Sequence, residues 1–188
     1  MSSKKTPFFN KRKMALAVAL IMLAFITTLI IRIPIPVSGG YFNIGDVFVL
    51  FAALWLGPLY GLLVGALGPT LADCVGYPQF IIATAVTKGL EGLIAGLIAG
   101  SGDKPQRKAL GAYTGGSIII VGYFVFEAFI YPAIGRFAPF FAVTNIGSAV
   151  VEVLPNALQA IVGASVALGL WRTASGGGPQ GDDQTSGA

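Results

Sequence analysis

Runs of 18 or more apolar residues recur along the chain, beginning with residues 14–31. A helix of that length crosses about 30 Å of hydrocarbon. The composition agrees, because 55% of the residues are hydrophobic and only 11% are charged, against roughly 25% charged residues in soluble domains. We therefore predict an all-α membrane protein with one compact membrane domain in its 188 residues.

The number of spans depends on whether residues 44–73 form one helix or two. Proline removes a backbone donor and disfavours helix at the preceding residue, so Gly57-Pro58 predicts a break. No small-x-small cleavage site follows residue 31, so we expect the first span to be retained. The six predicted spans are residues 14–31, 44–57, 58–73, 80–100, 109–133 and 146–171.

The distribution of basic residues predicts the orientation. With six spans, both termini and the loop 101–108 share one side, and that side carries nine of the twelve lysines and arginines. The opposite side holds only Arg32 and Arg136. Cytoplasmic loops are enriched in such residues, so we predict a multi-pass protein of the cell membrane with both termini in the cytoplasm.

This topology divides the chain into three parts. We expect residues 1–13 to form a basic cytoplasmic N-terminus and residues 14–172 to form the six-helix membrane domain. Residues 173–188 are rich in Gly, Ser, Asp and Gln, a composition typical of a disordered cytoplasmic tail.

Ionisable residues inside the predicted spans point to a functional site. A charge at the centre of a membrane helix costs at least about 2.5–3.5 kcal/mol, so such residues are usually functional. On the six-span topology all of them lie near the outer side of the membrane, which predicts a polar pocket facing outward. They are Asp46, Asp73, Lys88, Glu91, Glu127 and Glu152.

Three of the spans carry polar residues at helical spacing, so that each group forms a stripe on one face. The stripes are Thr84, Lys88 and Glu91 in the fourth span, Tyr123, Glu127 and Tyr131 in the fifth, and Glu152, Asn156 and Gln159 in the sixth. Facing stripes from three helices predict a cavity, to which the outer loops add further polar and aromatic groups. The expected substrate-binding residues are Asn43, Asp46, Tyr77, Gln79, Thr84, Lys88, Glu91, Tyr123, Glu127, Tyr131, Glu152, Asn156 and Gln159.

The alternative is that the charged groups only pair with one another. Lys88 and Glu91 are three residues apart, within reach on a helix. Five carboxylates nevertheless face one lysine within the spans, so pairing does not account for the whole set. The excess of carboxylates favours a neutral or cationic ring compound over a strongly anionic one. The role of Asp73 stays open.

Several classes of function are disfavoured. The chain has no histidine and one cysteine, Cys74, so we expect no metal site and no cofactor. The basic residues flank apolar spans, which is typical of membrane anchoring rather than of binding to nucleic acid. A membrane-embedded enzyme, a membrane scaffold of the cell-shape type and a stand-alone proton-coupled carrier remain as alternatives.

Four motifs together resemble the substrate-binding (S) components of energy-coupling factor (ECF) vitamin transporters, in the riboflavin, hydroxymethylpyrimidine and pyridoxine-like branch. The resemblance covers about residues 14–170. The motifs are Gly40-Tyr-Phe-Asn-Ile-Gly-Asp-Val, Leu56-Gly-Pro-Leu-Tyr-Gly, Leu71-Ala-Asp-Cys-Val-Gly-Tyr-Pro and Thr87-Lys-Gly-Leu-Glu-Gly-Leu-Ile-Ala-Gly.

This resemblance implies a six-helix membrane protein that binds a water-soluble vitamin or vitamin precursor from outside the cell. It also implies partners: a membrane coupling subunit and two cytoplasmic ATPases. The chain has no P-loop, so ATP hydrolysis is expected on the partners and the chain itself is expected not to be an enzyme. The family's small-xxx-small contact with the coupling subunit matches Ala15 and Ala19. The resemblance does not identify the vitamin.

Overall fold

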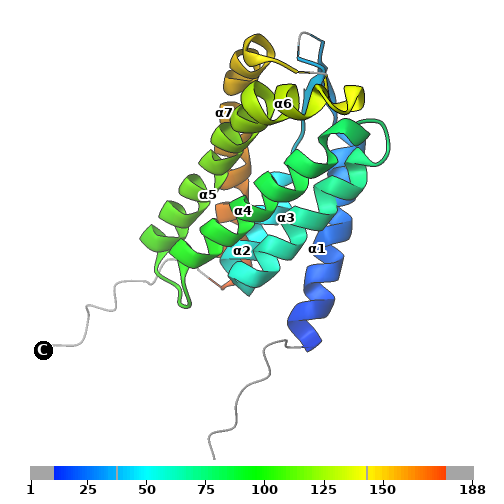
Figure 1. Ribbon diagram of the computed structural model, residues 1–188. Coiled ribbons are helices and arrows are strands. Elements are labelled where there is room, and N and C mark those ends of the chain that lie inside the picture. The colour runs from blue at the N-terminus through cyan, green and yellow to red at the C-terminus, as the bar shows by residue number, and fades with distance from the viewer. Residues whose placement is uncertain (1–10, 37, 143, 177–188) are drawn as a thin grey trace, which may run out of the picture.

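The computed structural model describes residues 11–36, 38–142 and 144–176, and most of them are helical (Figure 1). The α-helices are α1 (Lys11–Ile30), α2 (Asp46–Leu56), α3 (Pro58–Asp73), α4 (Ile81–Ala99), α5 (Pro105–Val125), α6 (Tyr131–Gly135) and α7 (Ile146–Ala174). The shorter elements are β1 (Ile33–Ile35), β2 (Gly40–Phe42), η1 (Pro78–Phe80), η2 (Phe126–Ile130) and η3 (Pro139–Phe141).

Length and composition identify the helices that suit a membrane. Among the described residues, four helical segments are long and apolar enough to cross one, namely Lys11–Ile30, Pro78–Ala99, Pro105–Gly135 and Ile146–Ala174. Helix α2 is apolar but shorter. Helix α1 begins three residues before the predicted span, and α7 extends to Ala174, two residues past the predicted end of the membrane domain at residue 172. Residues 1–10 and 177–188 lie outside the described residues.

The predicted break between the second and third apolar segments is confirmed. Gly57 has a φ of 109°, a conformation that glycine adopts without steric cost. Pro58 then starts α3 at a position where its missing N–H is not needed. The chain reverses there, so α2 and α3 form a pair of short helices.

Small residues bring the helices into close contact. A side chain at Gly61 would come within 2.6 Å of the Gly92 carbonyl oxygen, so α3 and α4 approach backbone to backbone. A side chain added at Gly111 on α5 would likewise come within 2.6 Å of the Ala95 carbonyl oxygen of α4. In lipid, where apolar burial does not drive association between helices, such close packing stabilises the bundle.

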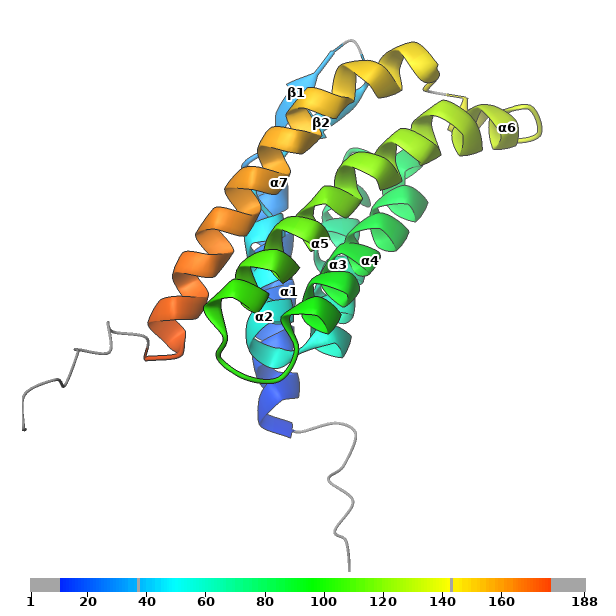
Figure 2. The same ribbon diagram turned by 90° about the vertical axis from the view of Figure 1, so that its left-hand side faces the viewer.

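The bundle has two distinct ends (Figures 1 and 2). Helix α1 begins and α7 ends at the terminal end, where the α2–α3 turn and the α4–α5 loop also lie. The opposite, hairpin end carries α6 and the antiparallel β1–β2 hairpin, which pairs Ile33 with Phe42 and Ile35 with Gly40. The sequence did not predict this hairpin.

Candidate functional site

A cavity lies between β2, the start of α4, the end of α5, η2 and the first half of α7, toward the hairpin end. Its volume is about 20 Å³, which is room for little more than one water molecule. Its lining residues are Gly40, Tyr41, Asn43, Phe80, Thr84, Tyr123, Glu127, Glu152, Asn156 and Gln159.

Two carboxyl groups from different helices meet at this cavity. Glu127, in η2, is fully buried, and its carboxyl group has no hydrogen-bond partner among the described residues other than the carboxyl group of Glu152. Glu152, in α7, is 5% exposed, and its Oε1 also lacks a partner within the described part of the chain. The Glu152 carboxylate lies against the backbone of Gly40, where a side chain would collide with it. The pair offers acceptors to a molecule that brings hydrogen-bond donors or a positive charge.

Amide side chains join the cavity wall to the loop before α2. The Gln159 Oε1 atom accepts a hydrogen bond of 2.8 Å from the Asn43 backbone N–H. The Gln159 amide donates to Asp46 Oδ2 over 2.5 Å. Asn43 Oδ1 accepts from the Gly45 N–H at 2.9 Å and so shapes the turn into α2. Gln159 therefore connects the cavity wall to a second polar group deeper in the bundle.

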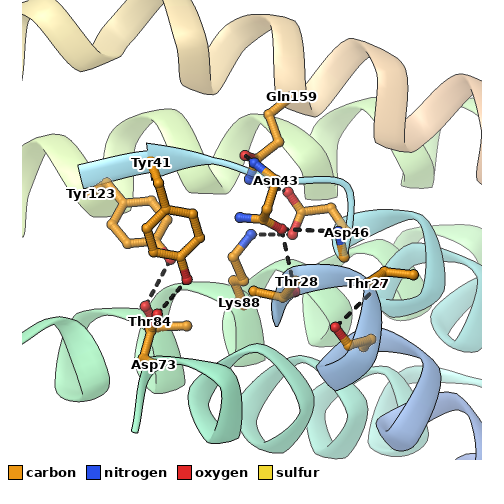
Figure 3. A network of polar contacts seen from close by, with 12 residues as sticks. Thr27, Thr28, Tyr41, Asn43, Asp46, Asp73, Thr84, Lys88, Tyr123 and Gln159 are labelled. Carbon is orange, nitrogen blue, oxygen red and sulfur yellow. Dashed lines mark hydrogen bonds and ion pairs between the residues drawn. The ribbon is translucent and has the colours of Figure 1, made fainter. Parts of the chain in front are cut away.

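That second group is a buried ion pair between Lys88 on α4 and Asp46 at the start of α2 (Figure 3). Their side chains are 1% and 0% exposed. Lys88 therefore pairs with a residue 42 positions away and not with its helical neighbour Glu91. Asp46, Lys88 and Glu91 were all predicted to bind substrate, but they lie outside the cavity lining.

Glu91 is fully buried one turn further along α4. Its carboxyl group lies beside the Lys88–Asp46 pair and has no hydrogen-bond partner other than Asp46 among the residues that the structure describes. Across the described ranges, no three His, Cys, Asp or Glu side chains are grouped so as to hold a metal ion.

The polar stripe predicted at Tyr123, Glu127 and Tyr131 is divided by the structure. Tyr123 lines the cavity, and its hydroxyl lies 3.0 Å from the Thr84 hydroxyl. Tyr131 is fully buried among Phe80, Phe126 and Phe141, and its hydroxyl accepts from the Ala83 N–H. The helix widens at this point into η2, in which the Tyr131 N–H donates to the Phe126 carbonyl five residues earlier. The aromatic contacts with Phe80 and Phe141, which belong to other elements, hold the Tyr131 ring in the core and away from the cavity lining.

The β1–β2 hairpin is fixed to the end of α3. The Tyr41 hydroxyl donates to Asp73 Oδ1 (Figure 3). Burial, together with this carboxylate, raises the pKa of Tyr41 above its ordinary value, so the hydroxyl stays protonated and remains a donor. The Arg32 guanidinium lies over the rings of Tyr41 and Tyr77 at 4.7 and 4.9 Å. It also donates to the carbonyls of Ala72 and Val75, both at 2.8 Å.

Tyr77 and Gln79 are half-buried near this hairpin and do not line the cavity. Sequence analysis missed three residues that do, namely Gly40, Tyr41 and Phe80. The aromatic residue in a Pro- and Gly-rich loop was a signal for Tyr41. Phe80 stands at the start of an apolar helix, where nothing in the sequence separates a cavity wall from a core position.

Comparison with known proteins identifies the family and the fold. Residues 9–174 match the family model described as ECF-type riboflavin transporter, S component. The fold resembles the solved structure titled "Structure and mechanism of the S component of a bacterial ECF transporter", with a TM-score of 0.64 and 17% sequence identity. That match covers 88% of this chain and 96% of the other. A curated relative from Pyrococcus woesei, an uncharacterized protein in gap 3′ region, is 39% identical over 116 residues, covering 62% of this chain and 78% of its own.

Proteins of this family are membrane transport components that bind a vitamin-type substrate and act with an ECF module. They are not enzymes, because ATP hydrolysis takes place on partner subunits. Family membership therefore excludes the enzyme and scaffold alternatives that the sequence left open. The chain belongs to the ECF-type riboflavin transporter S component family.

Proposed function

We propose that the cavity at the hairpin end is the substrate site, and that its substrate is a neutral or cationic ring compound with several hydrogen-bond donors. The observation that carries this proposal is Glu127, a fully buried side chain on the cavity wall whose only polar partner among the described residues is another acid, Glu152, so that the pair keeps free acceptors. A buried acceptor without a partner costs about 1–3 kcal/mol, and more when it is charged. Donors on a bound substrate would recover that energy.

The rest of the wall supports a planar ring. Tyr41, Phe80 and Tyr123 contribute aromatic surfaces, and Asn156 adds amide donor and acceptor groups. The family name makes riboflavin the first candidate. Its flat ring system would lie against the aromatic side chains, and the hydroxyls of its side chain would donate to Glu127 and Glu152. Two carboxyl groups in contact cannot both be ionised, so the pair carries at most about one negative charge, and this charge would disfavour a strongly anionic ligand.

The narrow cavity indicates that the wall moves when substrate enters. The space open to the centre of a water molecule is only about 20 Å³, too little for a vitamin. The β1–β2 hairpin closes this end through Tyr41 and Asp73, and Gly39 at its tip has a φ of 75°. We infer that release of this contact opens the site from the hairpin side.

The topology and the partners complete the proposal. We infer six spans with both termini in the cytoplasm, because nine basic residues gather on the side of the termini. The substrate cavity then faces outward. We further propose delivery with a membrane coupling subunit and two ATPase subunits. Ala15 and Ala19 are exposed on one face of α1, where a coupling subunit would find a close-packing surface.

Riboflavin titration of the purified full-length protein, followed by quenching of flavin fluorescence, tests the site. We expect Glu127→Gln to weaken binding about 10- to 100-fold, the equivalent of roughly 1.5–3 kcal/mol. Glu91→Gln is the matched control, since Glu91 is an equally buried carboxylate outside the cavity lining. Equal affinities of wild type and Glu127→Gln for the ligand that binds would contradict the site. Saturation by pyridoxine or hydroxymethylpyrimidine in place of riboflavin would keep the site and change the substrate.

A further inference from the structure

A second cavity lies at the terminal end of the bundle, far from the substrate cavity. It has a volume of about 550 Å³. The α2–α3 turn, the α4–α5 loop, the first turn of α1 and the last turn of α7 enclose it. We propose that this cavity binds an anionic phospholipid by its phosphate headgroup.

Two lysines from different helices bring positive charge into this cavity. Lys108 on α5 is only 4% exposed, and its ammonium donates to the Leu54 carbonyl at 2.8 Å and to the Gly100 carbonyl at 3.1 Å. Lys13 on α1 donates to the Leu56 carbonyl at 3.1 Å. Both lysines therefore converge on the C-terminal end of α2, where free carbonyls and the helix dipole attract cations.

The positive charge exceeds what this helix end requires. Arg107 lies close to Lys108, against Gly100, and donates to the Ile98 carbonyl at 3.2 Å. Lys108 and Arg107 together bring two positive charges, against about half a negative charge at the helix C-terminus and the carboxylate of Asp103 in the lining. An anionic group in the cavity would balance the excess.

The position of the cavity favours a lipid over a soluble anion. Both tryptophans of the chain, Trp55 and Trp171, line it, and tryptophan is enriched at the membrane–water interface. Lys108 lies 5.7 Å from the centre of the Trp171 ring. Leu97, also in the lining, is 59% exposed and extends the apolar surface for an acyl chain. Basic pockets between membrane helices at this level are known to hold anionic lipid headgroups.

The two tryptophans also report on the cavity. We would titrate delipidated full-length protein in detergent with brominated phosphatidylglycerol and, separately, with brominated phosphatidylcholine, while tryptophan fluorescence is recorded. The anionic lipid should quench at about one-tenth of the concentration that the zwitterionic lipid needs. Lys108 and Lys13 support α2, so their substitution affects folding as well as charge. Ser101 lies exposed in the lining loop, which makes Ser101→Glu and its isosteric control Ser101→Gln the better variants.

We expect Ser101→Glu to raise the midpoint for phosphatidylglycerol about tenfold, while Ser101→Gln stays near wild type. Equal quenching by the two lipids would identify ordinary surrounding lipid and overturn the proposal. Inorganic phosphate that displaces the brominated lipid, at an ionic strength matched with chloride, would show a site for the free anion and overturn the lipid assignment. If tryptophan emission shifts only when the energising module is added, the cavity is a protein-docking site and the lipid assignment is overturned.

Discussion

The ion pair between Lys88 and Asp46 allows a quantitative test of how the bundle supports the cavity. Both side chains are at most 1% exposed, and Asp46 also accepts a hydrogen bond from Gln159. Lys88→Met keeps most of the apolar stem and leaves the Asp46 carboxylate buried with one neutral donor. Breaking a buried pair in this way costs about 3–5 kcal/mol. At roughly 2–4 °C per kcal/mol for a chain of this size, the melting temperature should fall by about 6–20 °C.

Thermal unfolding of the purified protein in one detergent measures this loss. Adding Asp46→Asn to Lys88→Met removes the uncompensated charge, so the double variant should be more stable than Lys88→Met by about 2 kcal/mol. Lys104→Met is the control, because Lys104 is exposed in the α4–α5 loop, and it should change stability by less than about 0.5 kcal/mol. The reasoning is refuted if the stability losses of the two single variants simply sum in the double variant. It is also refuted if Lys88→Met has the same melting temperature as the wild type.

Three further predictions concern the hairpin, the helix contacts and the coupling surface. Tyr41→Phe removes the bond to α3 and should speed substrate association and dissociation in stopped-flow binding; because the pKa of Tyr41 is raised above 10, the wild-type rates should show no ionisation of this hydroxyl as the pH rises to 10. Gly92→Ala should lower stability by about 1–3 kcal/mol in thermal unfolding, since the added methyl meets the α3 backbone; Gly169→Ala, with open space around it, should not. Ala15→Leu with Ala19→Leu should reduce vitamin uptake in cells and leave the substrate affinity of the isolated protein unchanged, whereas loss of affinity would contradict a coupling role.

Sequence reasoning was most successful where a local pattern determines the structure. The break at Gly57-Pro58 follows from backbone chemistry alone, and it is present. The stripe of Glu152, Asn156 and Gln159 lies on one face of α7, which continues through Pro155, and all three residues line the cavity. Helical spacing is sufficient to predict which residues share a face when all of them belong to one continuous helix.

Contacts between distant segments could not be predicted in the same way. Asp46 as the partner of Lys88 depends on the packing of α2 against α4, whereas the sequence offered only the neighbouring Glu91. Tyr131 packs in a cluster with Phe80, Phe126 and Phe141 and is not in the cavity lining, and this depends on contacts with distant segments that the helical repeat does not predict. The β1–β2 hairpin, which brings Tyr41 over the cavity, consists of two three-residue strands that no periodicity identifies.

The most direct test of the substrate site is mass spectrometry of small molecules released from the purified full-length protein, after expression in cells supplied with a mixture of vitamins. We predict that the wild type releases a neutral or cationic ring compound in about equimolar amount, and that Glu127→Ala releases far less of it while Glu91→Ala releases a similar amount. Release of a strongly anionic compound, or of the same compound in equal amounts from wild type and Glu127→Ala, would contradict the account.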